Sequence, residues 1–224
     1  GIDLEDAKAG LKWLVSTGLV DPKRIAVAGR SYGGYMCLRA ATRMNDAWYA
    51  AVAGDDELPD LAIGRLPAAT PAEVARVAAK ILAFEAAAGA PWRSGVSLAA
   101  DNEDSTYDFQ NAVASLVPLL SGRFQVEAIQ LGELGPVTTR QRIRQAFDEG
   151  RLLVGWMGHG STVQWAGEGV FGTGTVPQLA SDNRQPIVSV MGCMNAAFHL
   201  GTADCLGEAL LEADARGASA FWGA

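Results

Sequence analysis

Two short apolar runs in the second half of the chain lack the spacing of a helix. Residues 151–158 read RLLVGWMG and are followed by His159, and residues 186–192 read PIVSVMG and are followed by Cys193. Runs of this length are typical of strands that are buried on both faces of a sheet. Because parallel strands end at a common edge, where ligands and catalytic groups collect, we expect His159 and Cys193 to meet there.

The rest of the chain alternates between helical and extended patterns. Strands alternating with helices predict one α/β domain over residues 1–224, a three-layer αβα fold with a mostly parallel sheet. Thr70, Pro71 and Glu73 form a capping-box pattern that opens one of the helices. The loop at 161–183 is long for a connection, which suits a substrate-binding segment. The expected helices are 3–17, a segment ending near 44, 71–88, 107–120, 139–148 and 203–213, and the further strands are 24–28, 49–53, 96–100, 124–129 and 218–222.

A cysteine and a histidine at neighbouring strand ends can act as nucleophile and proton carrier. Each residue alone has a plainer explanation, since Cys is usually a small buried hydrophobe and a single His in an apolar segment is usually structural. The chain contains only two His and three Cys, so their joint appearance at two strand ends favours a function.

Five segments carry a family resemblance: Leu58 to Arg65, Gly158 to Ser161, Phe171 to Thr173, Cys193 to Asn195 and Cys205 to Leu210. Together they resemble the gingipain-like cysteine peptidases of the caspase-like clan. The resemblance covers about residues 54–224 and implies a caspase-like fold and an endopeptidase with a Cys193/His159 dyad. It also implies an oxyanion site made by the backbone N–H groups of Gly160 and Cys193, no required cofactor, and a secreted or cell-surface location.

The same resemblance nominates substrate-binding residues. The segment Tyr107-Asp108-Phe109-Gln110 looks like the part of arginine-selective gingipains that carries a pocket carboxylate, which predicts cleavage after Arg or Lys. The alternative for Asp108 is a helix-capping role in the first turn. Trp165 either lines the same pocket or belongs to the core. The resemblance also allows structural calcium at the acidic segment 101–104, with a solvated acidic loop as the alternative.

The first 53 residues resemble a different family, the prolyl oligopeptidase-type serine peptidases. Residues 29–34, GRSYGG, match a nucleophile elbow in which Ser31 lies between glycines on a tight strand-to-helix turn. Such enzymes need a later Asp and His, and the pattern disappears after Gly54. The sequence therefore predicts a join near 52–55, from artificial chimera construction or from natural recombination, in which the first segment is scaffold and Ser31 is inert. A serine hydrolase that uses Ser31, or a catalytically silent scaffold, are the alternatives.

Composition and net charge argue against some classes of binding partner. The 224-residue chain has a net charge of −7 and a pI near 4.8, which argues against a nucleic-acid partner and is compatible with basic peptides. No apolar stretch is long enough to span a membrane. The cysteines at 37, 193 and 205 do not form the pattern of a disulfide framework. The gingipain-like resemblance implies a peptide or protein substrate and no metal ligand in the catalytic site, and the charge and hydropathy lead us to expect no nucleic-acid or membrane partner. The chain starts without a signal-peptide pattern and ends directly after an apolar run, which suggests a fragment.

Overall fold

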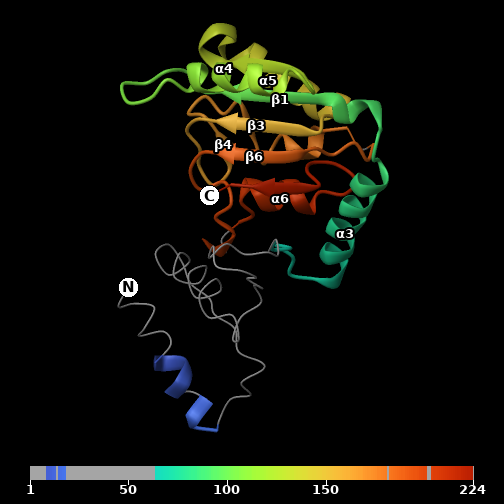
Figure 1. Cartoon of the computed structure of the whole chain (residues 1–224), viewed down its shortest axis with the longest axis vertical. Helices are drawn as coiled ribbons and strands as arrows, with labels where there is room; N and C mark the ends of the chain where they lie inside the picture. Colours follow the sequence, from blue (N-terminus) through green and yellow to red (C-terminus); the bar gives the residue numbers. More distant parts are fainter. Residues whose placement is uncertain (1–8, 14, 19–63, 181, 201–202, 224) are drawn as a thin grey trace. The chain divides into compact units, whose positions relative to one another are not determined.

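The computed structural model describes residues 9–13, 15–18, 64–180, 182–200 and 203–223 (Figure 1). The chain divides into two compact units, residues 1–65 and 66–224, which are described separately. In the first unit, residues 9–13 and 15–16 are helical, in agreement with the helix expected at 3–17. The expected nucleophile elbow with Ser31, its flanking strands and the join near 52–55 lie outside the described residues. The single-domain arrangement stays a prediction.

The second unit alternates strands and helices, as the sequence predicts. The expected helix at 71–88 and the strands at 96–100, 124–129 and 186–192 are confirmed to within about two residues at each end. The capping box is present, since Thr70 accepts from Glu73 N and the Glu73 carboxylate accepts from Thr70 N. In chain order the elements are α3 (Pro71–Ala86), η2 (Pro91–Ser94), β1 (Gly95–Ala100), α4 (Phe109–Leu120), β2 (Gln125–Gln130), α5 (Leu131–Glu149), β3 (Leu153–Met157), β4 (Gln164–Trp165), β5 (Phe171–Gly172), η3 (Val176–Gln178), β6 (Ile187–Met191), η4 (Phe198–Leu200), α6 (Leu206–Glu212) and β7 (Ala220–Trp222).

The central sheet has five strands in the order β2-β1-β3-β6-β7, and every neighbouring pair is parallel. β3 and β6 are neighbours in register, with Met157 opposite Met191 at their carboxyl ends. The expected parallel sheet is therefore confirmed. The long segment after β3 is not structureless, because β4 and β5 pair within it as a small antiparallel sheet.

Alternating side chains place helices on both faces of the sheet. Val154 and Trp156 of β3 face a core that includes residues of α5 and α6. Leu153 and Met157 face the opposite way, toward a second cluster that contains Val113 of α4. This alternation produces the three-layer αβα arrangement, in which the intervening β3 is buried from both sides.

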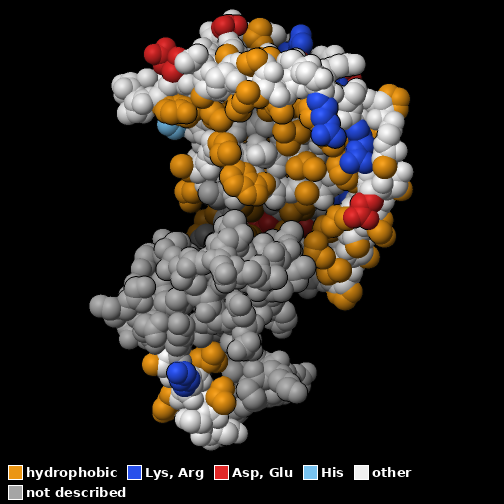
Figure 2. Space-filling view, in the orientation of Figure 1, with side chains coloured by type: hydrophobic (Ala, Val, Ile, Leu, Met, Phe, Trp, Pro, Cys, Tyr) orange, Lys and Arg blue, Asp and Glu red, His pale blue; other side chains and the backbone are white. Residues whose placement is uncertain are grey.

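The face on the α4 side is covered less completely than the other face. α4 packs on β1 and β2, and an apolar cavity of about 140 Å³ remains between α4 and strands β3 and β6. Figure 2 shows hydrophobic side chains gathered on the surface of this unit. On the α4-side face, Met191 and Trp222 are more than half exposed.

Helix α5 begins earlier than the sequence predicts. The expected helix was 139–148, whereas helical structure already starts at Leu131 and is interrupted at Gly135, whose φ is +70°. Pro136 directly follows and opens the straight part of the helix, where a missing N–H costs nothing. The Gly-Pro pair therefore marks a kink between two helical segments rather than a loop before one helix.

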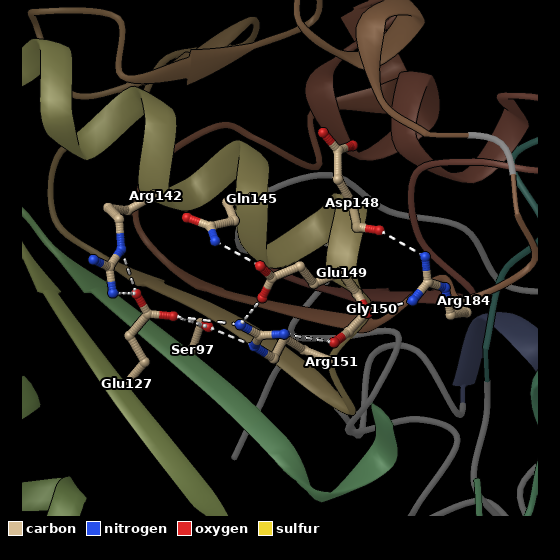
Figure 3. Close-up of polar contacts among 9 residues, drawn as sticks. All are labelled: Ser97, Glu127, Arg142, Gln145, Asp148, Glu149, Gly150, Arg151 and Arg184. Atoms are coloured by element: carbon tan, nitrogen blue, oxygen red, sulfur yellow. Dashed lines mark hydrogen bonds and ion pairs between the residues drawn. The ribbon is translucent and has the colours of Figure 1, made fainter. Parts of the chain in front are cut away.

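Charged side chains join the elements at the amino edge of the sheet (Figure 3). Arg151, just before β3, bonds to the hydroxyl of Ser97 at 3.2 Å and to Glu149 at 2.8 Å, and lies 3.7 Å from Glu127. Glu127 also accepts from Arg142 of α5 at 2.8 Å. The Arg151 side chain is 18% exposed, so these contacts are partly shielded from water and fix the start of the strand that leads to His159.

Among the described residues, no helix is both long enough and apolar enough to cross a membrane.

Candidate active site

The structure places His159 and Cys193 beyond the carboxyl ends of the adjacent strands β3 and β6. Each residue is the second after the register pair Met157–Met191. Gly158 N donates to Met191 O at 3.1 Å, which continues the pairing of the two strands into their turns. The two predicted site residues therefore lie at the same edge of the sheet, as the apolar runs suggested.

The two turns touch each other through glycines. A Cβ added to Gly192 would lie 2.7 Å from the carbonyl oxygen of Gly158, and one added to Gly160 would lie 2.9 Å from the carbonyl oxygen of Cys193. Both distances are shorter than a real Cβ contact, so only glycine allows this approach of the backbones.

His159 is held by two carboxylates that follow β1. Its backbone N–H donates to Asp101 at 2.8 Å, and its ring nitrogen Nε2 lies 2.7 Å from Oδ2 of Asp104. The ring also meets Phe109 edge to face, with 5.3 Å between the centroids. The imidazole is 62% exposed, so it is fixed in direction while remaining open to a substrate.

Asp104 is itself fixed by the turn that follows it. Its Oδ1 accepts from the hydroxyl and backbone N–H of Thr106, both at 2.6 Å, and from Tyr107 N at 2.8 Å. The bonds from Thr106, followed by the contact with His159, hold the pKa of this carboxyl well below its usual range. An ionised carboxylate can only accept, so Nε2 of His159 is the donor in this contact.

Asp101 behaves differently from Asp104. It is 3% exposed, and burial raises the pKa of its carboxyl despite the bonds from His159 N and Asn102 N. Both acids are engaged in local hydrogen bonds. No group of three or more His, Cys, Asp or Glu side chains in the described part of the chain is arranged to hold a metal. The calcium that the resemblance allows stays a prediction.

The two described cysteines are chemically distinct. Cys193 is exposed and free, whereas Cys205 is free and buried at the start of α6. Burial raises the pKa of the Cys205 thiol to about 11. Only Cys193 of this pair therefore offers an accessible sulfur.

Backbone donors lie beside both site residues. Among the described residues, no acceptor takes a hydrogen bond from the N–H of Gly160 or of Cys193. The neighbouring backbone is engaged, since Ser161 N donates to Gln164 O at 2.9 Å and Ala166 N to His159 O at 2.9 Å. The two groups that the resemblance assigns to an oxyanion site are thus free to donate.

The two predicted substrate-binding residues, Asp108 and Trp165, differ in exposure and in their contacts. Asp108 is exposed and caps α4 by accepting from Asn111 N at 2.8 Å, directly before the Phe109 ring that meets His159. Trp165 has no exposed surface and stacks on Trp156, with 5.5 Å between centroids and 2° between planes. Trp165 is therefore a core residue in this structure, because a fully buried ring cannot form a pocket wall.

The carboxylates around His159 and the buried Asn195 were not assigned to the dyad from the sequence. Asp101 and Asp104 follow β1, which is the neighbour of β3 on the side away from β6. The same strand-end rule that paired His159 with Cys193 could have placed them at this edge. Asn195 lies two residues after Cys193 and is fully buried; no sequence pattern distinguishes it from a surface turn residue.

Comparisons with known proteins identify the family of the chain. The sequence matches the family described as Peptidase family C25 over residues 7–224. Over 118 residues it is 33% identical to Gingipain R2 of Porphyromonas gingivalis, covering 53% of this chain and 15% of that protein. It is also 33% identical over 118 residues to Gingipain R1 of the same organism, covering 53% of this chain and 11% of that protein. The chain therefore spans only a small part of these relatives.

Solved structures show the same fold. The crystal structure of the Arg-specific cysteine proteinase gingipain R has a TM-score of 0.62 at 22% identity, covering 79% of this chain and 46% of that chain. A second structure, titled "Structure of Protease", has a TM-score of 0.58 at 18% identity and covers 97% of this chain and 56% of that chain. The family match begins within the first 53 residues and continues through the site to the end of the sequence, so the chain belongs to peptidase family C25.

Proposed function

We propose that this chain carries the catalytic site of a cysteine endopeptidase. His159 takes the thiol proton of Cys193, and the resulting Sγ thiolate attacks the scissile carbonyl carbon. The tetrahedral oxyanion is held by the N–H groups of Gly160 and Cys193. When the carbon–nitrogen bond breaks, His159 returns the proton to the leaving amine. Water then hydrolyses the acyl thioester, giving one proton to His159 and releasing the acid and the thiolate.

One observation carries this proposal: His159 and Cys193 follow register-paired parallel strands, on turns whose backbones touch. The thiol of Cys193 and the imidazole of His159 are both exposed, so a polypeptide substrate can reach them from the solvent. Membership of peptidase family C25 supports the same reaction.

Asp104 extends the predicted dyad. The resemblance requires no third residue, yet the contact between Asp104 Oδ2 and His159 Nε2 orients the imidazole and stabilises its charged form. We assign Asp104 the role of orienting carboxylate, which leaves Nδ1 to exchange protons with Cys193 and the leaving group.

The proposed selectivity for Arg rests on the carboxylate of Asp108. One similar solved structure is titled an Arg-specific cysteine proteinase, gingipain R. In this chain Asp108 lies at the start of the helix whose Phe109 touches His159. A carboxylate binds the planar guanidinium of Arg through two bonds but binds Lys as a point charge. We therefore assign Asp108 to the pocket for the residue before the scissile bond, with Arg preferred over Lys.

The test compares fluorogenic peptides that carry Arg, Lys or Leu before the scissile bond. We expect Arg to be cleaved best and Leu least. Cys193→Ala and His159→Ala should each lower kcat by at least about 1,000-fold, while Cys205→Ser, which keeps a capping side chain at α6, leaves it unchanged. Asp108→Asn should lower the turnover of Arg peptides by about 30-fold or more. Equal cleavage of Arg and Leu peptides contradicts the Asp108 assignment, and full activity in Cys193→Ala contradicts the peptidase site.

A second candidate is a serine hydrolase that uses Ser31, within a segment derived from a prolyl oligopeptidase-type enzyme and joined to the peptidase part. The elbow pattern at residues 29–34 favours it, whereas the family match from residue 7 onward favours one continuous peptidase. Fluorophosphonate labelling that is lost in Ser31→Ala would support the serine hydrolase. Labelling by neither fluorophosphonate nor iodoacetamide would support a silent scaffold.

The proposed partners are peptides or proteins, with basic side chains favoured by the net charge of −7. A secreted or cell-surface location is the expectation that accompanies the gingipain resemblance. Fractionation of the source organism, with antibody detection of the chain, tests it.

A further inference from the structure

A single buried amide joins the two turns of the site. Asn195 has no exposed surface, and its Nδ2 donates to Ser161 O and, at 3.4 Å, to Gln164 O. Both carbonyls belong to the segment that follows His159, Ser161 in the turn and Gln164 at the start of β4, whereas Asn195 belongs to the turn that follows Cys193. The side chain therefore connects the two halves of the proposed dyad without reaching either reactive group.

The backbone of Asn195 is held as firmly as its side chain. Its carbonyl accepts from Gly207 N at 2.8 Å, at the start of α6. The neighbouring Leu206 N donates to Thr162 O at 2.8 Å, so α6 contacts both turns. Met194, between Cys193 and Asn195, has a φ of +63°, a left-handed conformation that costs roughly 1 kcal/mol or more outside glycine. This turn directs Asn195 inward while Cys193 stays exposed.

The other end of the amide lies against the proposed oxyanion site. Oδ1 of Asn195 is 3.0 Å from the position that a Cβ on Gly160 would occupy, and Cys193 O is 2.9 Å from the same point. Among the described residues, this Oδ1 has no hydrogen-bond donor. An unpaired buried acceptor costs stability, so a role outside stability gives a physical reason for an amide at this position.

We propose that Asn195 is a positioning residue that fixes the turn carrying Gly160 against the turn carrying Cys193. Its amide donors set where the Gly160 N–H points relative to the sulfur. The inference rests on the proposed peptidase function, and it assigns to Asn195 no contact with the substrate. Because a misplacement of about 1 Å can cost about 100-fold in rate, losing these donors lowers kcat far more than it changes KM.

The kinetic test uses Asn195→Ala and the isosteric Asn195→Asp, which replaces the amide NH₂ with a carboxyl oxygen without leaving a cavity. We expect kcat for an Arg peptide to fall by about 100-fold in both variants, with KM within about threefold. A peptide aldehyde, whose adduct with Cys193 carries an oxyanion, should bind more weakly in proportion to kcat. Iodoacetamide forms no oxyanion, so alkylation of Cys193 should stay within about threefold.

Ser219→Ala is the matched control. Ser219 is also a buried polar residue whose side chain donates to a backbone carbonyl, that of Pro186, at the amino edge of the sheet. It should leave kcat and aldehyde binding unchanged. A loss in Asn195→Asp no larger than in Ser219→Ala, or a loss matched by slower alkylation, overturns the proposal.

Hydrogen exchange separates this inference from the peptidase proposal. If Asn195 holds the turn after His159, the N–H groups of Ser161 and Ala166 should exchange at least about tenfold faster in Asn195→Ala and unchanged in Ser219→Ala. This readout needs no turnover. Absence of Cys193-dependent cleavage in the unaltered protein would contradict the peptidase proposal alone, whereas unchanged exchange at Ser161 and Ala166 would overturn the role of Asn195.

Discussion

Nε2 of His159 and Oδ2 of Asp104 lie 2.7 Å apart, although the two residues are 55 positions apart in the sequence. Asp104 follows β1 and His159 follows β3, and these strands are neighbours in the sheet. The contact makes the orientation of the imidazole depend on a turn from a different strand. The chemistry of this edge therefore involves at least three strands rather than the two that carry His159 and Cys193.

We predict that Asp104→Asn lowers kcat for Arg peptides by about 100-fold, because an amide does not stabilise the charged imidazole as a carboxylate does. Glu103→Gln is the control, since Glu103 is an exposed acid next to Asp104. Equal loss in both variants would show that general charge, and not the contact with His159, is responsible.

The ionisation of the Asp104 carboxyl has a defined pH dependence. The hydrogen bonds from Thr106 and His159 hold the pKa of the Asp104 carboxyl well below its usual range, so it remains ionised as pH falls through the ordinary aspartate range. Its favourable contribution is present above that range and is lost only in stronger acid. An NMR titration of the Asp104 carboxyl carbon, whose signal is assigned by its absence in Asp104→Asn, should therefore give a midpoint below the ordinary aspartate range. A midpoint within or above that range would contradict this.

The strands and the reactive pair can be predicted from the sequence more accurately than the start of α5, and the difference has a physical reason. β1, β3 and β6 are short apolar runs that can be recognised without knowledge of the rest of the fold. The local pattern alone therefore locates the strands at residues 96–100 and 186–192. The carboxyl-edge rule then places His159 with Cys193. The start of α5 depends instead on tertiary contacts, such as the bond from Gly132 N to Gln110 at 2.8 Å, which no local pattern contains.

The residues that hold the reactive side chains and their turns in place are harder to predict than the reactive residues themselves. Asp104 looks like one of several acids in a polar turn, and only the adjacency of β1 and β3 gives it His159 as a partner. Asn195 looks like a turn residue, and only the contact between two turns buries it. Strand order in a sheet is set by long-range packing, so it must be known before such residues can be assigned.

We predict that Gly160→Ala inactivates the enzyme without unfolding it. The new methyl group would meet the carbonyl oxygen of Cys193 at 2.9 Å and push the two turns apart. We expect a loss of at least about 100-fold in kcat, measured with the Arg peptide beside a thermal melt. Gly167→Ala is the matched control, because a Cβ there meets nothing within 4 Å. Activity close to that of Gly167→Ala would argue against contact between the turns.

Cysteine reactivity should differ sharply between the two described thiols. With iodoacetamide at pH 8 we expect modification of Cys193 and none of Cys205, which is 1% exposed and whose pKa is raised to about 11 by burial. At that pH about one thousandth of the Cys205 thiol is thiolate, the reactive form. Peptide mass spectrometry reads out both sites, and the urea-unfolded protein, in which Cys205 also reacts, is the control. Equal rates at both residues in the folded protein would contradict the burial of Cys205.

We predict that the titration of Lys80 makes the free energy of unfolding increase as the pH rises into the alkaline range. Lys80 is 3% exposed as a residue, and its ammonium group donates to Leu210 O at 2.9 Å and Arg216 O at 3.1 Å. Burial lowers its pKa from 10.5 to about 8, an effect that nearby Asp214 and Glu212 oppose and Arg76 reinforces. Between these values the unfolded chain binds more protons than the folded one, so the free energy of unfolding rises with pH. The shift corresponds to roughly 3 kcal/mol.

The measurement compares urea unfolding of the unaltered protein and Lys80→Met at pH 7 and pH 11. Met removes the titrating group while keeping the length of the side chain, so titrations elsewhere cancel in the difference between the two proteins. That difference should shift by roughly 3 kcal/mol in favour of the unaltered protein at pH 11, because at pH 7 its buried ammonium is charged and costs the folded state its desolvation. Lys12→Met, at an exposed position, controls for the loss of a lysine. A difference that stays constant with pH would mean that Lys80 keeps its proton in the folded protein, and that its bonds to the two carbonyls outweigh the cost of burial.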